Sequence, residues 1–265
     1  MPVHRLSEIY PFNYYSFRPD GASALVALKS WFDRRALRRV LSRLAGERLH
    51  VLDVGGGTGW QLTQARQADP RVAFTQIVDI DPGAAAAARA AGHEFFVGRV
   101  EEFSPENKFD LVLLYNVVEH VADPAAVLAK VADLPTPGGV ALVQTPNYDS
   151  LDARVFRHRN WAGYHCPRHF ALFTRASFTA LCERKGLRVR TVSFLQGASF
   201  WAVSTLIVLH RRGWVRAAGD RPILEHWGFA PLALGFALLD GARSIVAKTS
   251  QMSFVLERAD SHNQK

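Results

Sequence analysis

The residues best suited to chemistry in this chain begin with a cluster of glycines behind a short apolar run. The run from Leu49 to Asp53 ends in an acid, and four glycines follow it closely: Gly55, Gly56, Gly57 and Gly59. This pattern is typical of a buried parallel strand that ends in a tight turn. Glycine allows positive φ and lets a ligand approach the backbone without meeting a Cβ, while the next helix offers unpaired N–H groups. We therefore expect a small-molecule pocket at this turn.

The glycine spacing separates the nucleotide-type cofactors. The dinucleotide pattern G-x-G-x-x-G fails because its third glycine would fall on Trp60. The phosphate loop G-x-x-x-x-G-K-[ST] fails because no lysine follows the glycines. What remains is D-x-G-x-G-x-G, from Asp53 through Gly55 and Gly57 to Gly59. A turn in which the glycines serve only steric needs stays open as the alternative at this point.

Polar residues also lie where the following strands are predicted to end. Asp79 closes the β-rich run Val72 to Val78, and an acid there can accept both ribose hydroxyls of a nucleoside. Ligands of parallel α/β sheets bind beyond the carboxyl ends of the strands. We expect one crevice to collect the residues at or just past those ends: Asp53, Asp79, Arg99, Asn116 and Asn147.

Three histidines are candidates for acid–base chemistry. His120 follows the fourth predicted strand, and His165 and His169 lie in the long loop after the fifth. A histidine is the natural base for deprotonating a hydroxyl near neutral pH, so we name His120 and His169 as catalytic candidates. His165 and Arg168 are candidates for substrate binding, since Arg168 suits a carboxylate or phosphate.

Both histidine assignments have alternatives. His120 could instead orient the loop after the fourth strand. A metal on His165, His169 and Cys166 would need a second cluster of ligands, which the sequence does not show, so we predict no metal.

Strands and helices alternate in a way that would position these residues. The predicted strands are 49–53, 72–78, 95–98, 109–115, 140–145, 187–194 and 251–257. An amphipathic helix over 24–44 precedes them, and helices are predicted over 61–67, over 83–91, after the Asp123-Pro124 cap and after the Thr174 cap. Such alternation implies right-handed crossovers and one mostly parallel sheet. The fold class is α/β, doubly wound.

Four segments in order carry a family resemblance: LDVGGGTG, VDID, FDLVLLYNVVEHVADP and PGGVALVQTPN. Over residues 49–147 they resemble class I S-adenosylmethionine (SAM)-dependent methyltransferases, in the branch of the ubiquinone-biosynthesis O-methyltransferases. A weaker resemblance covers 167–192. It implies a seven-stranded Rossmann-like sheet of order 3-2-1-4-5-7-6 and SAM as the cofactor.

The resemblance also implies where the cofactor lies. SAM would sit over Gly55, Gly57 and Gly59 and near Asn116, with its ribose on Asp79 and its adenine against Ile80 and Val100. Many family members carry an acid after the equivalent of Gly98, whereas this chain has Arg99, so Glu101 or the backbone near Val100 would meet the adenine amino group. The aromatic segment 10–18, with Tyr15, would cover the cofactor or simply pack on the fold.

Composition limits the remaining possibilities. The 265 residues, 48% of them hydrophobic, suit one α/β domain with an added element. We expect a lid segment and helix over 1–48, the SAM-binding core over 49–196, an apolar helical insertion over 197–250 and a last strand and tail over 251–265. Two cysteines and an N-terminus without an apolar signal favour a cytoplasmic location.

Charge and the insertion raise the question of partners. The net charge of +8 is spread over several segments, which favours solvated faces or attraction to anionic membrane or substrate surfaces, with nucleic acid as the alternative. The apolar runs 198–209 and 227–246 are too short or too interrupted for a membrane span. They could pack on the fold, or form an interfacial hairpin with Arg211, Arg212 and Arg216 facing anionic headgroups.

The expected function is transfer of a methyl group from SAM to oxygen of a small-molecule, glycan or lipid-linked acceptor. Such an in-line displacement mainly requires that donor and nucleophile be held in place and that water be excluded. Two alternatives stay open: a SAM-fold protein that binds without transfer, and a membrane-surface or nucleic-acid binder that acts through its basic faces.

Overall fold

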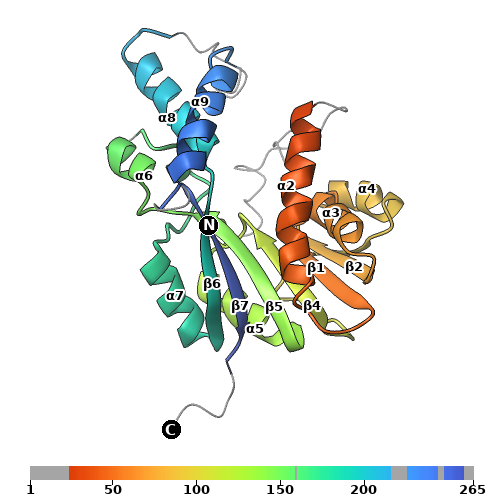
Figure 1. Ribbon diagram of the computed structural model, residues 1–265. Coiled ribbons are helices and arrows are strands. Elements are labelled where there is room, and N and C mark those ends of the chain that lie inside the picture. The colour runs from red at the N-terminus through yellow and green to blue at the C-terminus, as the bar shows by residue number, and fades with distance from the viewer. Residues whose placement is uncertain (1–23, 159, 216–225, 244–247, 260–265) are drawn as a thin grey trace.

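The computed structural model describes residues 24–158, 160–215, 226–243 and 248–259 (Figure 1). The predicted lid segment 10–18 with Tyr15, and Arg216 of the insertion, lie outside the described residues.

A seven-stranded sheet of order β3-β2-β1-β4-β5-β7-β6 forms the centre of the fold. Its strands are β1 (Leu49–Val54), β2 (Val72–Asp79), β3 (Glu94–Val97), β4 (Phe109–Tyr115), β5 (Pro135–Pro146), β6 (Leu187–Leu195) and β7 (Gln251–Arg258). The first five strands pair in parallel, and β7 runs antiparallel to both β5 and β6. The predicted fold class and strand order are confirmed.

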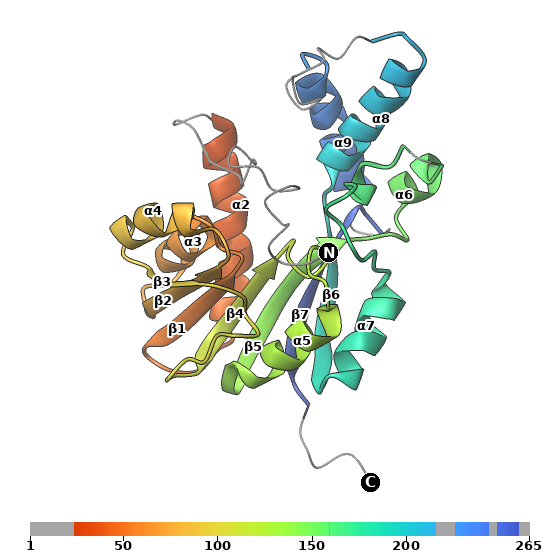
Figure 2. The same cartoon turned by 180° about the vertical axis from the view of Figure 1, so that it is seen from behind.

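Helices cover both faces of the sheet, as Figures 1 and 2 show from opposite sides. One face carries α2 (Ala24–Leu41), α3 (Trp60–Ala68) and α4 (Ala85–Ala90, after the 3₁₀ turn Pro82–Ala84), and the other carries α5 (Pro124–Asp133) and α7 (Arg175–Arg184). The predicted helix starts are confirmed: the Asp123 carboxylate accepts from the backbone N–H groups of Ala125 and Ala126, and Thr174 forms a capping box with Ser177. Because alternate strand residues point to opposite faces, Val51 and Leu52 of β1 enter different core clusters.

Two predicted boundaries differ from the structure by more than two residues. The first helix ends at Leu41 rather than at 44, although Leu44 is still buried beneath it. β5 begins at Pro135, five residues before the predicted start at 140. Phe109 pairs with Pro135 before the register shifts to Leu111 opposite Val140, so the intervening Gly138, at φ 83°, lies in an irregular stretch of the strand.

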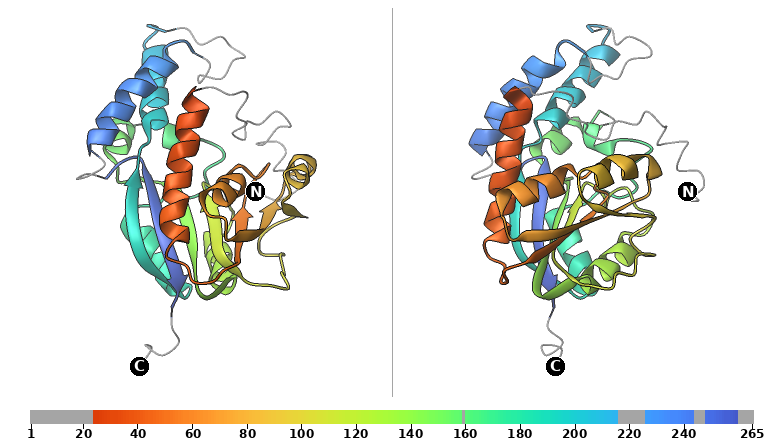
Figure 3. Two further views of the ribbon diagram at one scale, coloured as in Figure 1. Left: turned by 45° about the vertical axis from the view of Figure 1, so that its right-hand side comes forward. Right: turned by 90° about the vertical axis from the view of Figure 1, so that its right-hand side faces the viewer.

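The insertion before the last strand forms two helices, α8 (Ala198–Arg211) and α9 (Phe229–Arg243), as predicted. They pack together through Trp201 and Phe236, whose rings stack at 5.0 Å. The Asp240 carboxylate accepts a hydrogen bond from the backbone N–H of Gly197 and pairs with Arg243. The pair projects beyond the carboxyl ends of the parallel strands, above β6, β7 and α6 (Leu151–Phe156) (Figure 3). Among the described helices, none has the length and apolarity needed to cross a bilayer.

Candidate active site

The glycine turn after β1 has the open backbone that a ligand would need. Gly57 has a φ of 52°, and a Cβ built there would meet no atom within 4 Å. Its N–H donates to the carboxylate of Asp79 over 2.9 Å. Gly55, at φ 73°, has no such space, because its Cβ would lie 2.5 Å from Cγ2 of Val117 in the loop after β4. The turn is therefore open to a ligand at Gly57, whereas at Gly55 it packs against the loop that follows β4.

Gly59 serves packing rather than ligand access. It is buried, and a Cβ there would lie 2.4 Å from the ring of His93, which precedes β3. His93 is held by Thr63 and Thr75, at 3.1 and 2.8 Å. The predicted cofactor role of Gly59 is thus indirect: it lets α3 begin close to the sheet.

Asp79, at the end of β2, is tied to two backbone groups. One carboxylate oxygen accepts from Gly57 and the other from the N–H of Asp81, both at 2.9 Å. Burial raises the pKa of Asp79, and these hydrogen bonds act in the opposite direction. Since each carboxylate oxygen has two lone pairs, hydroxyl groups of a ligand can still be accepted there.

Asp53 lies beneath the turn rather than on its outer side. The carboxylate is 2% exposed, and a Cβ on Gly56 would sit 2.7 Å from its Oδ2. Within the described part of the chain this Oδ2 has no hydrogen-bond partner. Burial, and secondarily the nearby charge of Asp79, raises the pKa of Asp53 well above its usual value. A buried acceptor without a partner is costly, so this oxygen is suited to a polar ligand group or a water at the turn.

These features fit the cofactor that the sequence resemblance implies. SAM carries an amino group, a sulfonium and a ribose diol, all of which suit acidic or hydrogen-bond-accepting partners. Asp79 supplies such partners beside the uncovered backbone of Gly57, and Asp53 supplies a buried acceptor beneath the turn.

The predicted adenine contacts are only partly available. Ile80 is 50% exposed and can cover a flat apolar ring. The Val100 side chain is buried in the core, which leaves its backbone as the part able to meet a ligand. The Glu101 carboxylate forms an ion pair with Arg99, the residue that departs from the family pattern.

Asn116 follows β4 with a φ of 55°, which is uncommon for a residue other than glycine. Its exposed side chain accepts a hydrogen bond from Nε2 of Gln251 in β7 over 2.9 Å. Gln251 was not predicted as a site residue, because nothing near it in sequence marks it. Only the placement of β7 beside β5 brings it to this edge of the sheet.

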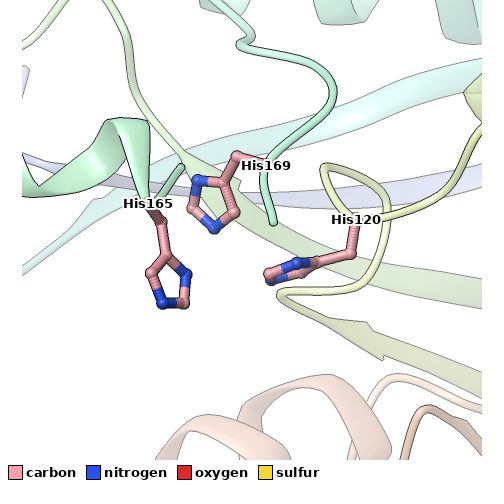
Figure 4. Close-up of side chains that lie close together, drawn as sticks. All are labelled: His120, His165 and His169. Carbon is pink, nitrogen blue, oxygen red and sulfur yellow. The ribbon is translucent and has the colours of Figure 1, made fainter. Parts of the chain in front are cut away.

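The three candidate histidines form one cluster (Figure 4). The ring centroid of His169 lies 4.5 Å from that of His120 and 5.0 Å from that of His165. Nδ1 of His120 lies 3.2 Å from the carbonyl oxygen of Arg168, and Nδ1 of His169 lies 2.7 Å from that of Gly163. Arg168 reaches Nε2 of His165 with its guanidinium at 3.2 Å. The structure thus unites the predicted catalytic and substrate-binding residues.

The electrostatic environment keeps these imidazoles neutral. Burial, followed by the charges of His169 and His165, lowers the pKa of His120 to about 3. Burial also lowers the pKa of His165 to about 4 and lowers that of His169. Three neutral rings with their lone pairs close together can accept hydrogen bonds or hold an electrophile.

Buried polar contacts anchor the loop that carries two of these histidines. Trp161 donates to the Asp152 carboxylate over 2.7 Å, and the Ala162 N–H donates to Oγ of Ser204 in α8 over 2.9 Å. The Phe170 N–H donates to the carbonyl of Glu119, beside His120. The insertion and the β4 loop therefore position the histidine loop together.

Glu119 is a site residue that sequence reasoning missed. Its buried carboxyl accepts from Oγ1 of Thr145 in β5, and burial raises its pKa to about 8. The signal available was its place beside His120, but its side-chain direction could not be predicted.

Known proteins resemble this chain in sequence. A family profile described as "Methyltransferase domain" matches residues 30–192. The ubiquinone biosynthesis O-methyltransferase of Rhodopseudomonas palustris (strain HaA2) is 31% identical over 171 residues, which cover 62% of this chain and 56% of that protein. The protein of the same name from Bradyrhizobium sp. (strain ORS 278) is 32% identical over 141 residues, or 50% of this chain and 48% of its own length. The chain spans about half the length of the curated relatives it matches.

Solved structures share the fold. A SAM-dependent methyltransferase from Archaeoglobus fulgidus superposes with a TM-score of 0.53 at 16% identity, covering 89% of this chain and 100% of that one. The [4+2]-cyclase SpnF superposes with a TM-score of 0.57 at 14% identity, covering 92% and 86%. At these identities the likeness concerns the fold alone. The family match, which extends over more than half of the chain, confirms the resemblance read from the sequence: this chain belongs to the methyltransferase domain family.

Proposed function

We propose that this protein is a SAM-dependent methyltransferase that acts on a hydroxyl oxygen of its acceptor. The observation that carries the proposal is the meeting of two features at the carboxyl ends of β1, β2, β4 and β5. One is the open turn at Gly57 tied to Asp79, and the other is the histidine cluster. Val117 joins them, since it packs on Gly55 and its carbonyl accepts from the N–H of His120 over 2.9 Å.

Each side of the site has its own task. SAM supplies the methyl group on a sulfonium, and Asp79 and Asp53 bind its hydroxyl and amino groups. His120 helps to hold the acceptor hydroxyl, and Nε2 of His169 takes its proton as the C–O bond forms and the C–S bond breaks. The Gly163 carbonyl fixes the proton of His169 on Nδ1, so that Nε2 carries the lone pair. S-adenosylhomocysteine is the product of the displacement.

The acceptor we propose is a small molecule or a lipid-linked compound with an anionic group. Arg168 borders the cluster and can pair with a carboxylate or phosphate, with His165 beside it. Support for oxygen as the target comes from the curated relatives, which are named O-methyltransferases.

We also propose that the α8–α9 pair contacts an anionic membrane surface from the cytoplasmic side. The outward stripe of α9 is apolar, with Leu234, Leu238 and Leu239 exposed by 65%, 70% and 44%. Exposed basic and aromatic side chains lie at the far end of α8 and beyond it: Arg211, Arg212 and Trp214. Apolar stripes flanked by cations are typical of interfacial helices. Since α8 also anchors the histidine loop through Ser204, a membrane-bound acceptor would arrive near the cluster.

Two alternatives have less support. The fold also occurs in a cyclase, so a chain that binds SAM without transferring methyl groups is compatible with the fold. Nucleic-acid binding would need available cations, yet in α2 Arg34 bonds Gln64 and Gln67 and Arg38 bonds the carbonyl of Ala68.

Calorimetry with SAM tests the cofactor site. We expect Asp79→Ala to weaken SAM binding by about 1.5–3 kcal/mol, or roughly 10- to 150-fold, because it removes charged hydrogen-bond acceptors. Asp81→Ala is the matched control: in the described structure its exposed carboxylate bonds only the nearby Gly83 N–H, and the substitution keeps the backbone N–H that donates to Asp79. Unchanged affinity in Asp79→Ala would place the cofactor elsewhere.

A screen of hydroxylated acceptors, scored by release of S-adenosylhomocysteine, tests transfer. His169→Gln should keep SAM binding and lose turnover. SAM binding without turnover on any acceptor would favour the non-transferring alternative.

Sedimentation with vesicles tests membrane contact. The wild type should pellet with vesicles that contain phosphatidylglycerol and less with phosphatidylcholine alone. The double variant Leu234→Ser/Leu238→Ser should stay in the supernatant, whereas Val155→Ser, at a 57% exposed position on α6, should behave as wild type. Equal pelleting of all three proteins would show that the apolar stripe of α9 does not contribute to membrane binding.

A further inference from the structure

The histidine cluster has the composition of a metal site. His120, His165 and His169 each offer one ring nitrogen, and these three atoms lie within 4.8 Å of one another. Figure 4 shows each ring turning a nitrogen toward the space between them. The sequence alone could not predict this set of three ligands. His165 and His169 lie in one loop, and only the fold shows that His120 of another loop lies beside them.

The hydrogen bonds behind two of the rings match those of metal-binding histidines. The Arg168 carbonyl lies behind His120, and the Gly163 carbonyl lies behind His169. A carbonyl oxygen can only accept, so Nδ1 of each neutral ring carries the proton and Nε2 the lone pair. Metal-bound histidines commonly donate their second nitrogen to a backbone carbonyl, which fixes both the tautomer and the direction of the ring.

We propose that His120, His165 and His169 bind one divalent transition-metal ion of the Zn²⁺ class. Three imidazoles suit zinc and its neighbours rather than the oxygen-seeking Mg²⁺ or Ca²⁺. Within the described residues the cluster includes no carboxylate. The neighbouring Glu119 accepts from Thr145 through Oε2, and its buried Oε1 has no hydrogen-bond partner among the described residues. Tetrahedral zinc at about 2.1 Å from nitrogen sets its ligands roughly 3.4 Å apart, so the rings need to close by at most about 1.4 Å. A fourth position stays available to water or to an acceptor oxygen.

The position of Arg168 predicts the direction in which its removal should change metal affinity. Its guanidinium donates to Nε2 of His165, so in the described arrangement it competes for that ring's lone pair and repels a cation. Metal binding through Nδ1 of His165 would transfer the proton to Nε2 and displace the guanidinium. Removing Arg168 should therefore leave metal affinity unchanged or increase it, although the same change should weaken the binding of an anionic acceptor.

The consequence for catalysis rests on the proposed function. An acceptor hydroxyl bound to the ion would lose its proton to solvent more readily, and its oxygen would then form the C–O bond as the C–S bond of the sulfonium breaks. The three histidines would then act as ligands rather than as free bases.

Titration with Zn²⁺ and with Co²⁺ tests the site without SAM or acceptor. The protein should carry no affinity tag and should first be treated with chelator. We expect one ion per chain, with Co²⁺ giving the visible absorption bands of a low-coordinate nitrogen site. His169→Gln should weaken binding by at least the 10- to 100-fold that loss of an outer-shell partner causes. His158→Gln, an exposed histidine outside the cluster, is the control and should bind as wild type.

Each outcome decides the proposal. Equal Zn²⁺ affinity in the wild type and in His169→Gln, or less than one ion per wild-type chain at saturation, would overturn it. So would a loss in Arg168→Gln as large as that in His169→Gln. Circular dichroism and SAM calorimetry on each variant show whether the fold and cofactor site are intact, so failure of the metal site is distinguishable from failure of the proposed methyl transfer.

Discussion

The contact between Gly55 and Val117 joins the glycine turn after β1 to the loop that carries His120, and a double-mutant cycle can measure it. Replacing Gly55 with alanine would put a Cβ 2.5 Å from Cγ2 of Val117, whereas ordinary contact begins near 3.4 Å. The turn or the β4 loop would have to move by about 0.9 Å. Because the Gly55 N–H also donates to the Val78 carbonyl at 2.8 Å, the turn cannot move without straining its bond to β2.

Two costs make up the expected effect of Gly55→Ala. Keeping a φ of 73° with a side chain costs about 1–2 kcal/mol. Overpacking against Val117 costs a further 1–3 kcal/mol or so. We expect the free energy of unfolding to fall by about 2–5 kcal/mol in all, and SAM affinity to fall as the turn shifts.

The second substitution separates these costs. Val117→Ala removes Cγ2, and the nearest remaining atom of that side chain, its Cβ, lies 3.8 Å from the new methyl group. In the Val117→Ala background, Gly55→Ala should therefore cost only the backbone part, about 1–2 kcal/mol. The coupling energy of the cycle is then about 1–3 kcal/mol.

Urea unfolding of the four proteins, followed by circular dichroism, gives the cycle, and SAM calorimetry gives its functional counterpart. Gly138→Ala is a control for the backbone cost alone, since Gly138 has a φ of 83° and an open Cβ position. If Gly55→Ala cost the same with and without Val117, the turn would not rest on the β4 loop and the proposed union of the two half-sites would be refuted.

Three further predictions concern polar side chains that hold the loops and helices around the site. The pKa of Asp53 is raised in the folded state above its ordinary value near 3.8, so the folded chain holds this proton more tightly and stability should fall as pH rises above that value. In Asp53→Asn the midpoint of urea unfolding should therefore change less between pH 4 and 7 than in the wild type. Parallel pH profiles of the two proteins would contradict the assignment. Trp161→Phe leaves the Asp152 carboxylate without its 2.7 Å donor and should lower the free energy of unfolding by about 1–3 kcal/mol. Most turnover should be lost, while SAM affinity measured by calorimetry stays constant. A matching loss of SAM affinity would mean that this loop also forms part of the cofactor site. Asp123→Ala removes two cap bonds at the start of α5 and should lower stability by about 1 kcal/mol in thermal unfolding, unlike Asp133→Ala at the other end of that helix.

Local patterns were enough for much of the fold. Apolar runs of strand length and the Asp123 and Thr174 caps act through neighbours a few residues apart, so they can be read directly along the chain. The strand order came from the family resemblance and is confirmed. Boundaries failed where a long-range contact decided them, as at Pro135, which joins β5 because Phe109 lies opposite it.

The candidate site was likewise predicted only in part from the sequence. The sequence by itself determined the glycine turn, the acid at the end of β2 and the histidines near two further strand ends, because parallel strands bring their carboxyl ends to one edge. It could not determine what each side chain meets. Gly59 faces His93, Val100 points into the core and Gln251 reaches Asn116 from a strand 135 residues away.

Tertiary structure alone decided that His120 joins His165 and His169. The loops that carry them are far apart in the chain and meet because β4 and β5 are neighbours and because Trp161, Ser204 and the Glu119 carbonyl hold the second loop over the first. Side-chain direction within a loop depends on such contacts, which no local periodicity encodes. The sequence therefore determined which residues could do chemistry, and the packing of the loops decided that three of them share one site.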